Sequence, residues 1–136
     1  DGTVIIPLAV NILVESAGAT TQGEILLGFA TSDVGNGTSS AASAGPTSLN
    51  AAAPVASACT ARQLATADVS ADYALELKRF SFAASAVNQD FTWLASQQHV
   101  YSVLRGAATL MVYIGGNAVQ FYGQMQWIEL VESAVS

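Results

Sequence analysis

The segment Val4–Glu15 alternates apolar side chains between two faces, and this period of two is the strongest constraint on the fold. One face is entirely large and apolar: Ile6, Leu8, Val10, Ile12 and Val14. A two-residue period rich in β-branched side chains predicts a β-strand with one buried face. Pro7 cannot donate a ladder hydrogen bond, so we expect this strand to run along a sheet edge near its start.

The same alternation returns in Glu24–Thr31, where Ile25, Leu27 and Phe29 share a face. Because only residues 16–23 join this segment to the first, we expect the two to form an antiparallel hairpin.

Further along the chain, the apolar residues at odd positions 73–77 give way to Phe80 and Phe82 in the opposite phase. A strand that changes its apolar face predicts a bulge near Lys78–Arg79, or two strands that meet there. Two more short strands are expected: Asp90–Ala95, which holds Phe91 and Trp93 in alternation, and Val100–Leu104.

The last part of the chain predicts a hairpin. Ala107–Ile114 is an apolar strand, Gly115-Gly116-Asn117 tolerates the positive φ of tight turns, and Val119–Val131 returns. One face of the returning strand carries Val119, Phe121, Met125, Trp127 and Val131, which we expect in the core. The opposite face is polar but uncharged and is the candidate contact face for another subunit or a glycan: Gln120, Tyr122, Gln124 and Gln126.

Residues 32–71 form a long stretch of Ser, Ala, Gly, Thr, Asn and Pro with few large apolar residues. This is far longer than an ordinary connection. We expect an ordered excursion that packs on the sheet or on a neighbouring subunit. Ala51–Ala58 is the best candidate for a helical turn, and Pro54 argues against a long helix.

About seven or eight short strands, with no sustained 3.6-residue period, predict an all-β fold. We expect residues 1–136 to form one antiparallel β-sandwich or jelly roll, with the long excursion inserted.

Charge is scarce: the 136 residues include 4 Lys and Arg and 10 Asp and Glu, and the net charge is −6. Average soluble domains carry about 25% charged residues, against 10% here. A lone monomer of this composition would have trouble staying in solution, which predicts a surface covered by neighbouring copies. Four cations give no phosphate track, which argues against nucleic-acid binding. No stretch reads as a membrane-spanning helix.

The sequence offers little chemistry. His99 is the only histidine, and Cys59 is the only cysteine. The common metal sites need at least two such ligands. Asp72 and Glu76 would lie about 13 Å apart on one strand face, too far for a catalytic pair. The segment Asp33–Thr38 is typical of a turn more than of a calcium loop. We therefore expect no enzyme activity, cofactor or metal; a triad using His99 is the enzymatic alternative.

The alternating opening Val4–Val14, the Ala/Ser/Gly/Thr-rich excursion Ser32–Ala71 and the closing segment Ala107–Val131 together resemble the small jelly-roll proteins of virus and phage particles. These include capsid, decoration and spike subunits. The resemblance implies a non-enzymatic structural role, as a trimer or higher homo-oligomer. The absence of a basic arm favours an outer position without genome contact.

The expected function is therefore that of a self-assembling virion subunit whose partners are copies of itself and other virion proteins. The expected location is the virion or the extracellular space. The alternative is a secreted adhesin, pilus-like subunit or glycan-binding sandwich module, because exposed flat aromatic rings such as Tyr122 stack on sugars.

Overall fold

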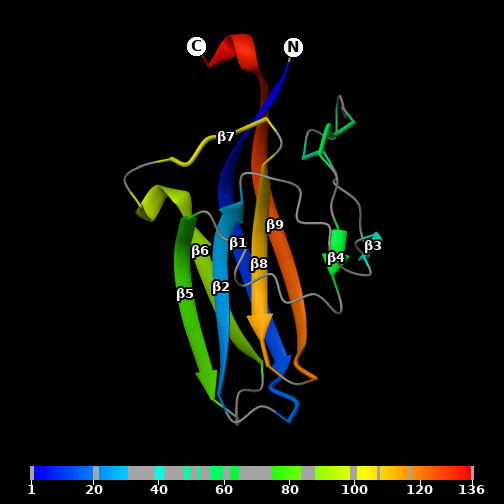
Figure 1. Ribbon diagram of the computed structural model, residues 1–136, viewed down its shortest axis with the longest axis vertical. Coiled ribbons are helices and arrows are strands. Elements are labelled where there is room, and N and C mark those ends of the chain that lie inside the picture. The colour runs from blue at the N-terminus through cyan, green and yellow to red at the C-terminus, as the bar shows by residue number, and fades with distance from the viewer. Residues whose placement is uncertain are drawn as a thin grey trace.

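The computed structural model describes residues 2–19, 22–30, 39–41, 48–49, 52, 56–59, 62–64, 75–83, 88–98, 101–106, 108–116 and 118–135. The regular elements there are strands and two single-turn 3-10 helices (Figure 1). In chain order they are β1 (Thr3–Ser16), β2 (Gln22–Ala30), β3 (Ser39–Ala41), β4 (Arg62–Leu64), β5 (Leu75–Ala83), β6 (Gln89–Leu94), η2 (Ala95–Gln97), β7 (Leu104–Arg105), β8 (Thr109–Gly115), β9 (Gln120–Val131) and η3 (Glu132–Ala134).

Two antiparallel sheets pack face to face, which confirms the predicted all-β sandwich. In the first sheet β1 is central: β9 pairs along one edge, and the short ladders of β6 and β7 share the other. In the second sheet β2 is central, between β5 and β8. Figure 1 shows β5 and β6 along one side of the sandwich and β8 and β9 along the other.

Each short connection crosses from one sheet to the other. The chain passes between sheets from β1 to β2, from β5 to β6, from β7 to β8 and from β8 to β9, so the fold is built from stacked arches. Both predicted hairpins are therefore wrong, because β1 pairs with β9 and not β2, and β8 pairs with β2 and not β9. The alternation of apolar residues indicates which face of a strand is buried, but it does not indicate which strand is its partner. A connection of four or five residues can close a hairpin within one sheet, or it can span the roughly 10 Å between two packed sheets.

The core lies between the inner faces of the two sheets. Alternating positions of β1 (Val10, Ile12 and Val14) meet Ile25 and Leu27 of β2 there. The flanking strands add the aromatic residues Phe82, Phe91 and Trp93, all of them buried. The predicted core faces of β1, β2 and β6 are thus correct in their central portions.

Pro7 lies in the central strand of its sheet, so the predicted edge position is wrong. The β1–β9 register shifts between Pro7 and Ala9, which makes Leu8 a bulge residue. On the opposite edge, β1 is paired by β7 at residues 4–5 and by β6 only from Ala9 onward. Pro7 therefore lies beside a bulge and in a gap between two ladders, where a proline is tolerated. Pro7 is buried, whereas Leu8 is only partly so.

The bulge predicted in the strand of Phe80 and Phe82 is present. The register with β2 shifts between Lys78 and Glu76, so Leu77 is the extra residue, one position before the predicted place. The shift brings Leu77, Phe80 and Phe82 to the same core. Lys78 extends over the Phe80 ring, with its Nζ 5.7 Å from the ring centroid.

Of the predicted strand Val100–Leu104, only Leu104 belongs to the two-residue strand β7, residues 101–103 lie in no strand, and Val100 lies outside the described residues. Within the long excursion, β3 and β4 pair as a small ribbon that the sequence did not predict. Most of the excursion, including half of the predicted helical turn Ala51–Ala58, lies outside the described residues; the described half, residue 52 and residues 56–58, contains no helix.

Two strand glycines offer a matched test of the core. Gly23 lies opposite Phe82, and a Cβ built on Gly23 would stand 2.1 Å from Phe82 Cζ. We expect Gly23→Ala to lower the free energy of unfolding by about 1–3 kcal/mol, because the ring has no room to move in a packed core. Urea unfolding followed by tryptophan fluorescence measures this change.

Gly123→Ala is the control. Its Cβ would meet Ile12 Cδ1 at 3.4 Å, an ordinary contact. We expect this variant to be neutral, or more stable by about 0.5 kcal/mol through the stiffer unfolded chain. Equal losses in both variants would contradict the packing of Phe82 over Gly23.

Candidate functional site

The predicted contact face lies on the outer side of the first sheet. Met125 of β9 packs against the core, so the alternating residues of β9 point away from it. Gln120, Tyr122 and Gln124 are exposed and Gln126 is half-buried. The structure thus gathers the four predicted residues on one face, and the side chain of Tyr122 is 63% exposed.

Residues of β1 and β6 extend this face across the sheet. Opposite the β9 residues, the registers place three cross-strand rows: Tyr122–Leu13–Asp90, Gln124–Asn11–Thr92 and Gln126–Ala9–Leu94. Asp90 is the only charged residue in these rows. Ile128, on the same face of β9, adds a large apolar side chain that is 42% exposed. This outer surface therefore combines uncharged polar side chains with apolar ones and carries little charge.

The opposite face of β9 is buried only in part. Val119 and Met125 pack against the core as predicted, and Trp127 is half-buried. Phe121 and Val131 are 42% and 60% exposed, so their predicted burial is wrong. Both lie near the ends of β9.

Glu129 anchors part of the excursion to β9. Its carboxylate accepts hydrogen bonds from the Ser57 hydroxyl, from the Ala58 backbone N–H at 2.9 Å and from Trp127 Nε1 at 2.8 Å. Burial alone would raise the pKa of Glu129, but these three donors outweigh it and lower the pKa to about 2. The carboxylate therefore stays ionised and holds residues 57–58 against the strand.

Cys59 lies beside this anchor and is held as a thiol. Its backbone N–H donates to Ser57 Oγ at 3.0 Å. Burial, together with the neighbouring Glu129 carboxylate, raises the pKa of the Cys59 thiol above its ordinary value. The thiolate is the nucleophilic form, so this environment disfavours a reactive cysteine.

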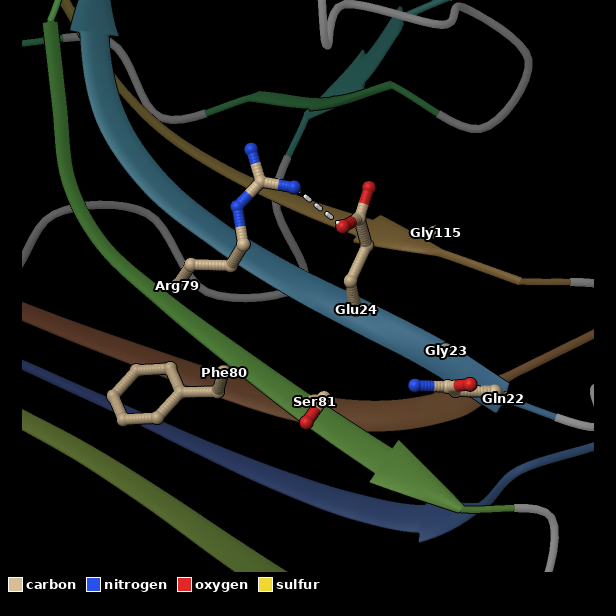
Figure 2. A pocket seen from close by; sticks show the side chains of 7 residues that line it. All are labelled: Gln22, Gly23, Glu24, Arg79, Phe80, Ser81 and Gly115. Carbon is tan, nitrogen blue, oxygen red and sulfur yellow. Dashed lines mark hydrogen bonds and ion pairs between the residues drawn. The ribbon is translucent and has the colours of Figure 1, made fainter.

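A shallow depression of about 500 Å³ lies on the second sheet. It is lined by Gln22, Gly23, Glu24, Arg79, Phe80, Ser81 and Gly115. Figure 2 shows the Arg79 side chain reaching Glu24, with the Phe80 ring pointing away from both. Arg79 binds Glu24 at 2.6 Å and Glu76 through two further hydrogen bonds of 3.1 and 2.7 Å. Its guanidinium is thus neutralised by two carboxylates and is a poor site for an anion.

The other residues considered from the sequence do not assemble into a site. His99, Asp72 and the segment 33–38 lie outside the described residues. Within the described ranges, no group of three His, Cys, Asp or Glu side chains is placed to hold a metal ion. Those ranges also contain no helix of the length and apolarity needed to cross a membrane.

Sequence reasoning missed the anchoring role of Glu129. A usable signal exists, because Glu129 is the only charged residue between Arg105 and Glu132. A single charge retained in so long an uncharged stretch indicates a specific partner.

Comparison with protein-family models, with curated proteins and with solved structures gave no match.

The anchor predicts a pH dependence of stability. The pKa of Glu129 is lower in the folded chain than its ordinary 4.5, so its contribution is complete above about pH 4.5 and is lost as the pH falls toward 2. We expect Glu129→Gln to lower the free energy of unfolding at pH 7 by about 1–2 kcal/mol, allowing for partial screening by solvent. The difference between native and variant proteins should shrink between pH 4.5 and 2, as measured by denaturant unfolding.

Glu15→Gln is the matched control, because Glu15 is an exposed carboxylate near the end of β1. We expect it to change the free energy of unfolding at pH 7 by less than about 0.5 kcal/mol. A Glu129→Gln protein as stable at pH 7 as the Glu15→Gln protein would contradict the anchor.

Proposed function

We propose that this protein is a non-enzymatic structural subunit that assembles with copies of itself through the β8–β9 side of the sandwich. The observation that carries the proposal is the unequal charge of the two sides. The β5–β6 side carries Glu76, Lys78, Arg79 and Asp90. Within β8 and β9 the only charged residue is Glu129, and its carboxylate is already bound within the chain.

Charge on an edge strand is one of the main devices that keep sheets from joining. The β5–β6 side has this device and the β8–β9 side lacks it. Together with the exposed Tyr122 and Ile128, this makes the β8–β9 side the surface best suited to contact between copies. Assembly through such a surface depends on apolar burial and hydrogen bonds, and little on ion pairs.

The second part of the proposal concerns the kind of assembly to which the protein belongs. We place the chain among the jelly-roll subunits of virus or phage particles, as a capsid, decoration or spike protein in a trimer or larger assembly. The stacked arches support this, because in these folds successive strands also lie in opposite sheets. The shortage of cations supports an outer position that contacts other virion proteins and not the genome.

A secreted adhesin or glycan-binding module is the second candidate. It is favoured by the exposed ring of Tyr122, set in a row of amide side chains that can hydrogen-bond sugar hydroxyls. On a glycan array, binding that disappears in Tyr122→Ala while the fold is retained would select this function over self-assembly.

The assembly proposal predicts an oligomer that persists in roughly 1 M salt, where the Debye length is about 3 Å. Light scattering coupled to size exclusion at micromolar concentration measures its mass. We expect Gln124→Lys to dissociate the oligomer, because a buried ammonium without a partner is costly at an interface.

Gln89→Lys provides the matched control, since Gln89 is an exposed strand glutamine on the charged β5–β6 side. This variant should assemble as the native protein does. A monodisperse native monomer, or equal assembly of the two lysine variants, would refute the proposal.

A further inference from the structure

We propose that two copies of this chain exchange β9, so that β9 of each copy pairs with β1 of the other in the register seen within one chain. This inference goes beyond the proposed packing of the β8–β9 side, because it names the segment that joins one copy to the next and the residues that receive it.

Strand β9 can leave its own chain as one unit. Within the part of the chain that the structure describes, β8 pairs only with β2 and β9 only with β1, so no ladder joins β8 to β9. The β1–β9 ladder extends from the pair of Thr3 and Val131 to the pair of Ser16 and Gln120. A β9 strand from a second copy restores all of these pairs. The exchange needs no free sheet edge, because the incoming strand takes the place of the one that left.

The connection between β8 and β9 is strained at Ala118. Each of the four connections that cross between the sheets contains a described residue with φ between 53° and 68°: Gly18, Asn88, Gly106 and Ala118. Glycine and asparagine enter this left-handed region readily, whereas alanine does so at a cost in free energy. Ala118, at φ 58°, is thus the strained residue of the four. A short connection under strain favours domain exchange, because an extended connection relieves the strain while every other contact is remade.

The place of this connection suits an exchange between two copies. Strand β8 ends and β9 begins at the same end of the sandwich, and η3 lies at the opposite end (Figure 1). When the connection extends, β9 projects from that end into a second copy. Each copy then gives one strand and receives one about a two-fold axis, which closes the assembly as a pair.

The exchange turns the Glu129 anchor into a contact between copies. Within one chain, the carboxylate accepts hydrogen bonds from the Ser57 hydroxyl and the Ala58 backbone N–H. Both donors belong to the part of the chain that stays behind, so they bind Glu129 of the incoming strand. The Trp127 Nε1 donor moves together with β9. The segment that lies against β9 in one chain therefore secures β9 of the second copy.

Exchange and side packing join copies at different levels. Exchange forms pairs, and the proposed packing of the β8–β9 sides joins pairs into the larger assembly. Gln124 lies on the outer face of β9 whether or not that strand is exchanged. We therefore expect Gln124→Lys to break the larger assembly down to exchanged pairs.

Cysteine cross-linking tests the exchange in the complete chain. In a Cys59→Ala background, Thr3→Cys and Val131→Cys are placed on separate, differently tagged chains, co-expressed and treated with a short bifunctional thiol reagent. Because Thr3 and Val131 are partners in the β1–β9 register, we expect a covalent dimer joined between positions 3 and 131. Non-reducing electrophoresis and mass spectrometry identify the linked pair.

The matched control uses a ladder that the exchange leaves within each copy. Asn11 and Thr92 are partners in the β1–β6 register, so Asn11→Cys and Thr92→Cys on separate chains should give no link. Light scattering on each variant before cross-linking establishes whether it assembles.

Hinge variants test the role of Ala118 after unfolding and refolding at a series of concentrations. A left-handed alanine is disfavoured by a factor of about 5–30, and a pair contains two such connections. We therefore expect Ala118→Gly, which relieves the strain in the closed chain, to raise the dissociation constant of the pair by about 25-fold or more. Ala118→Pro should increase the linked fraction, because a proline φ of about −65° does not fit the closed connection. Asn88→Gly, in the β5–β6 connection, is the control and should leave the dissociation constant unchanged.

The outcomes separate the two proposals. If the variants assemble but the 3–131 mixture links no more than the control, the exchange is overturned while self-assembly stands. If the native chain and the variants are monomers, both proposals fail. A 3–131 link that persists in a Gln124→Lys background confirms the exchange, and it does so even if Gln124→Lys leaves the size of the assembly unchanged, which would refute the side packing alone. Equal dissociation constants for Ala118→Gly and Asn88→Gly would overturn the role of strain at Ala118.

Discussion

The fold depends on the packing of two inner faces that belong to different sheets. The central strands β1 and β2 supply much of this contact, and each is flanked on both sides. Because the four short connections β1–β2, β5–β6, β7–β8 and β8–β9 all cross the gap, each joins one strand of the first sheet to one strand of the second. The connections that join these strands therefore also bring the two sheets together. A packing defect in the inner face affects both sheets. The close approach of the Phe82 ring to Gly23 shows how little free space this arrangement leaves.

Strand faces could be predicted from the sequence, and strand partners could not. The alternation of Val10, Ile12 and Val14 correctly assigns the buried face of β1, and Phe91 and Trp93 do the same for β6. The pairing of β1 with β9 depends on contacts more than a hundred residues apart, and nothing in the alternation encodes them. Short connections biased the prediction toward hairpins, although the same lengths allow arches.

Irregularities were predictable where they changed the apolar pattern. The bulge at Leu77 shifts the phase between Leu77 and Phe80, so the sequence reveals it. The bulge at Leu8 lies within an almost wholly apolar segment. It buries Pro7 in place of Leu8, and because both residues are apolar, the alternation of the sequence does not reveal the bulge. The shared outer face of Gln120, Tyr122, Gln124 and Gln126 was predictable from their alternation, whereas the exposure of Phe121 was not, since Phe121 follows the same alternation as Met125, which packs against the core.

The distribution of charge links the fold to the proposed function. A chain with so few charged side chains can protect only part of its surface against association with other copies. Here most of the charged strand residues lie on β5 and β6. The one charge within β8 and β9 holds residues 57–58, so the Glu129 carboxylate is bound within the chain and does not act as a repulsive group. The same carboxylate thus secures the excursion and leaves the neighbouring strand edge electrostatically neutral. An uncharged edge is costly for a protein that must remain a monomer, because it invites pairing, and it is useful for a subunit whose task is to join others.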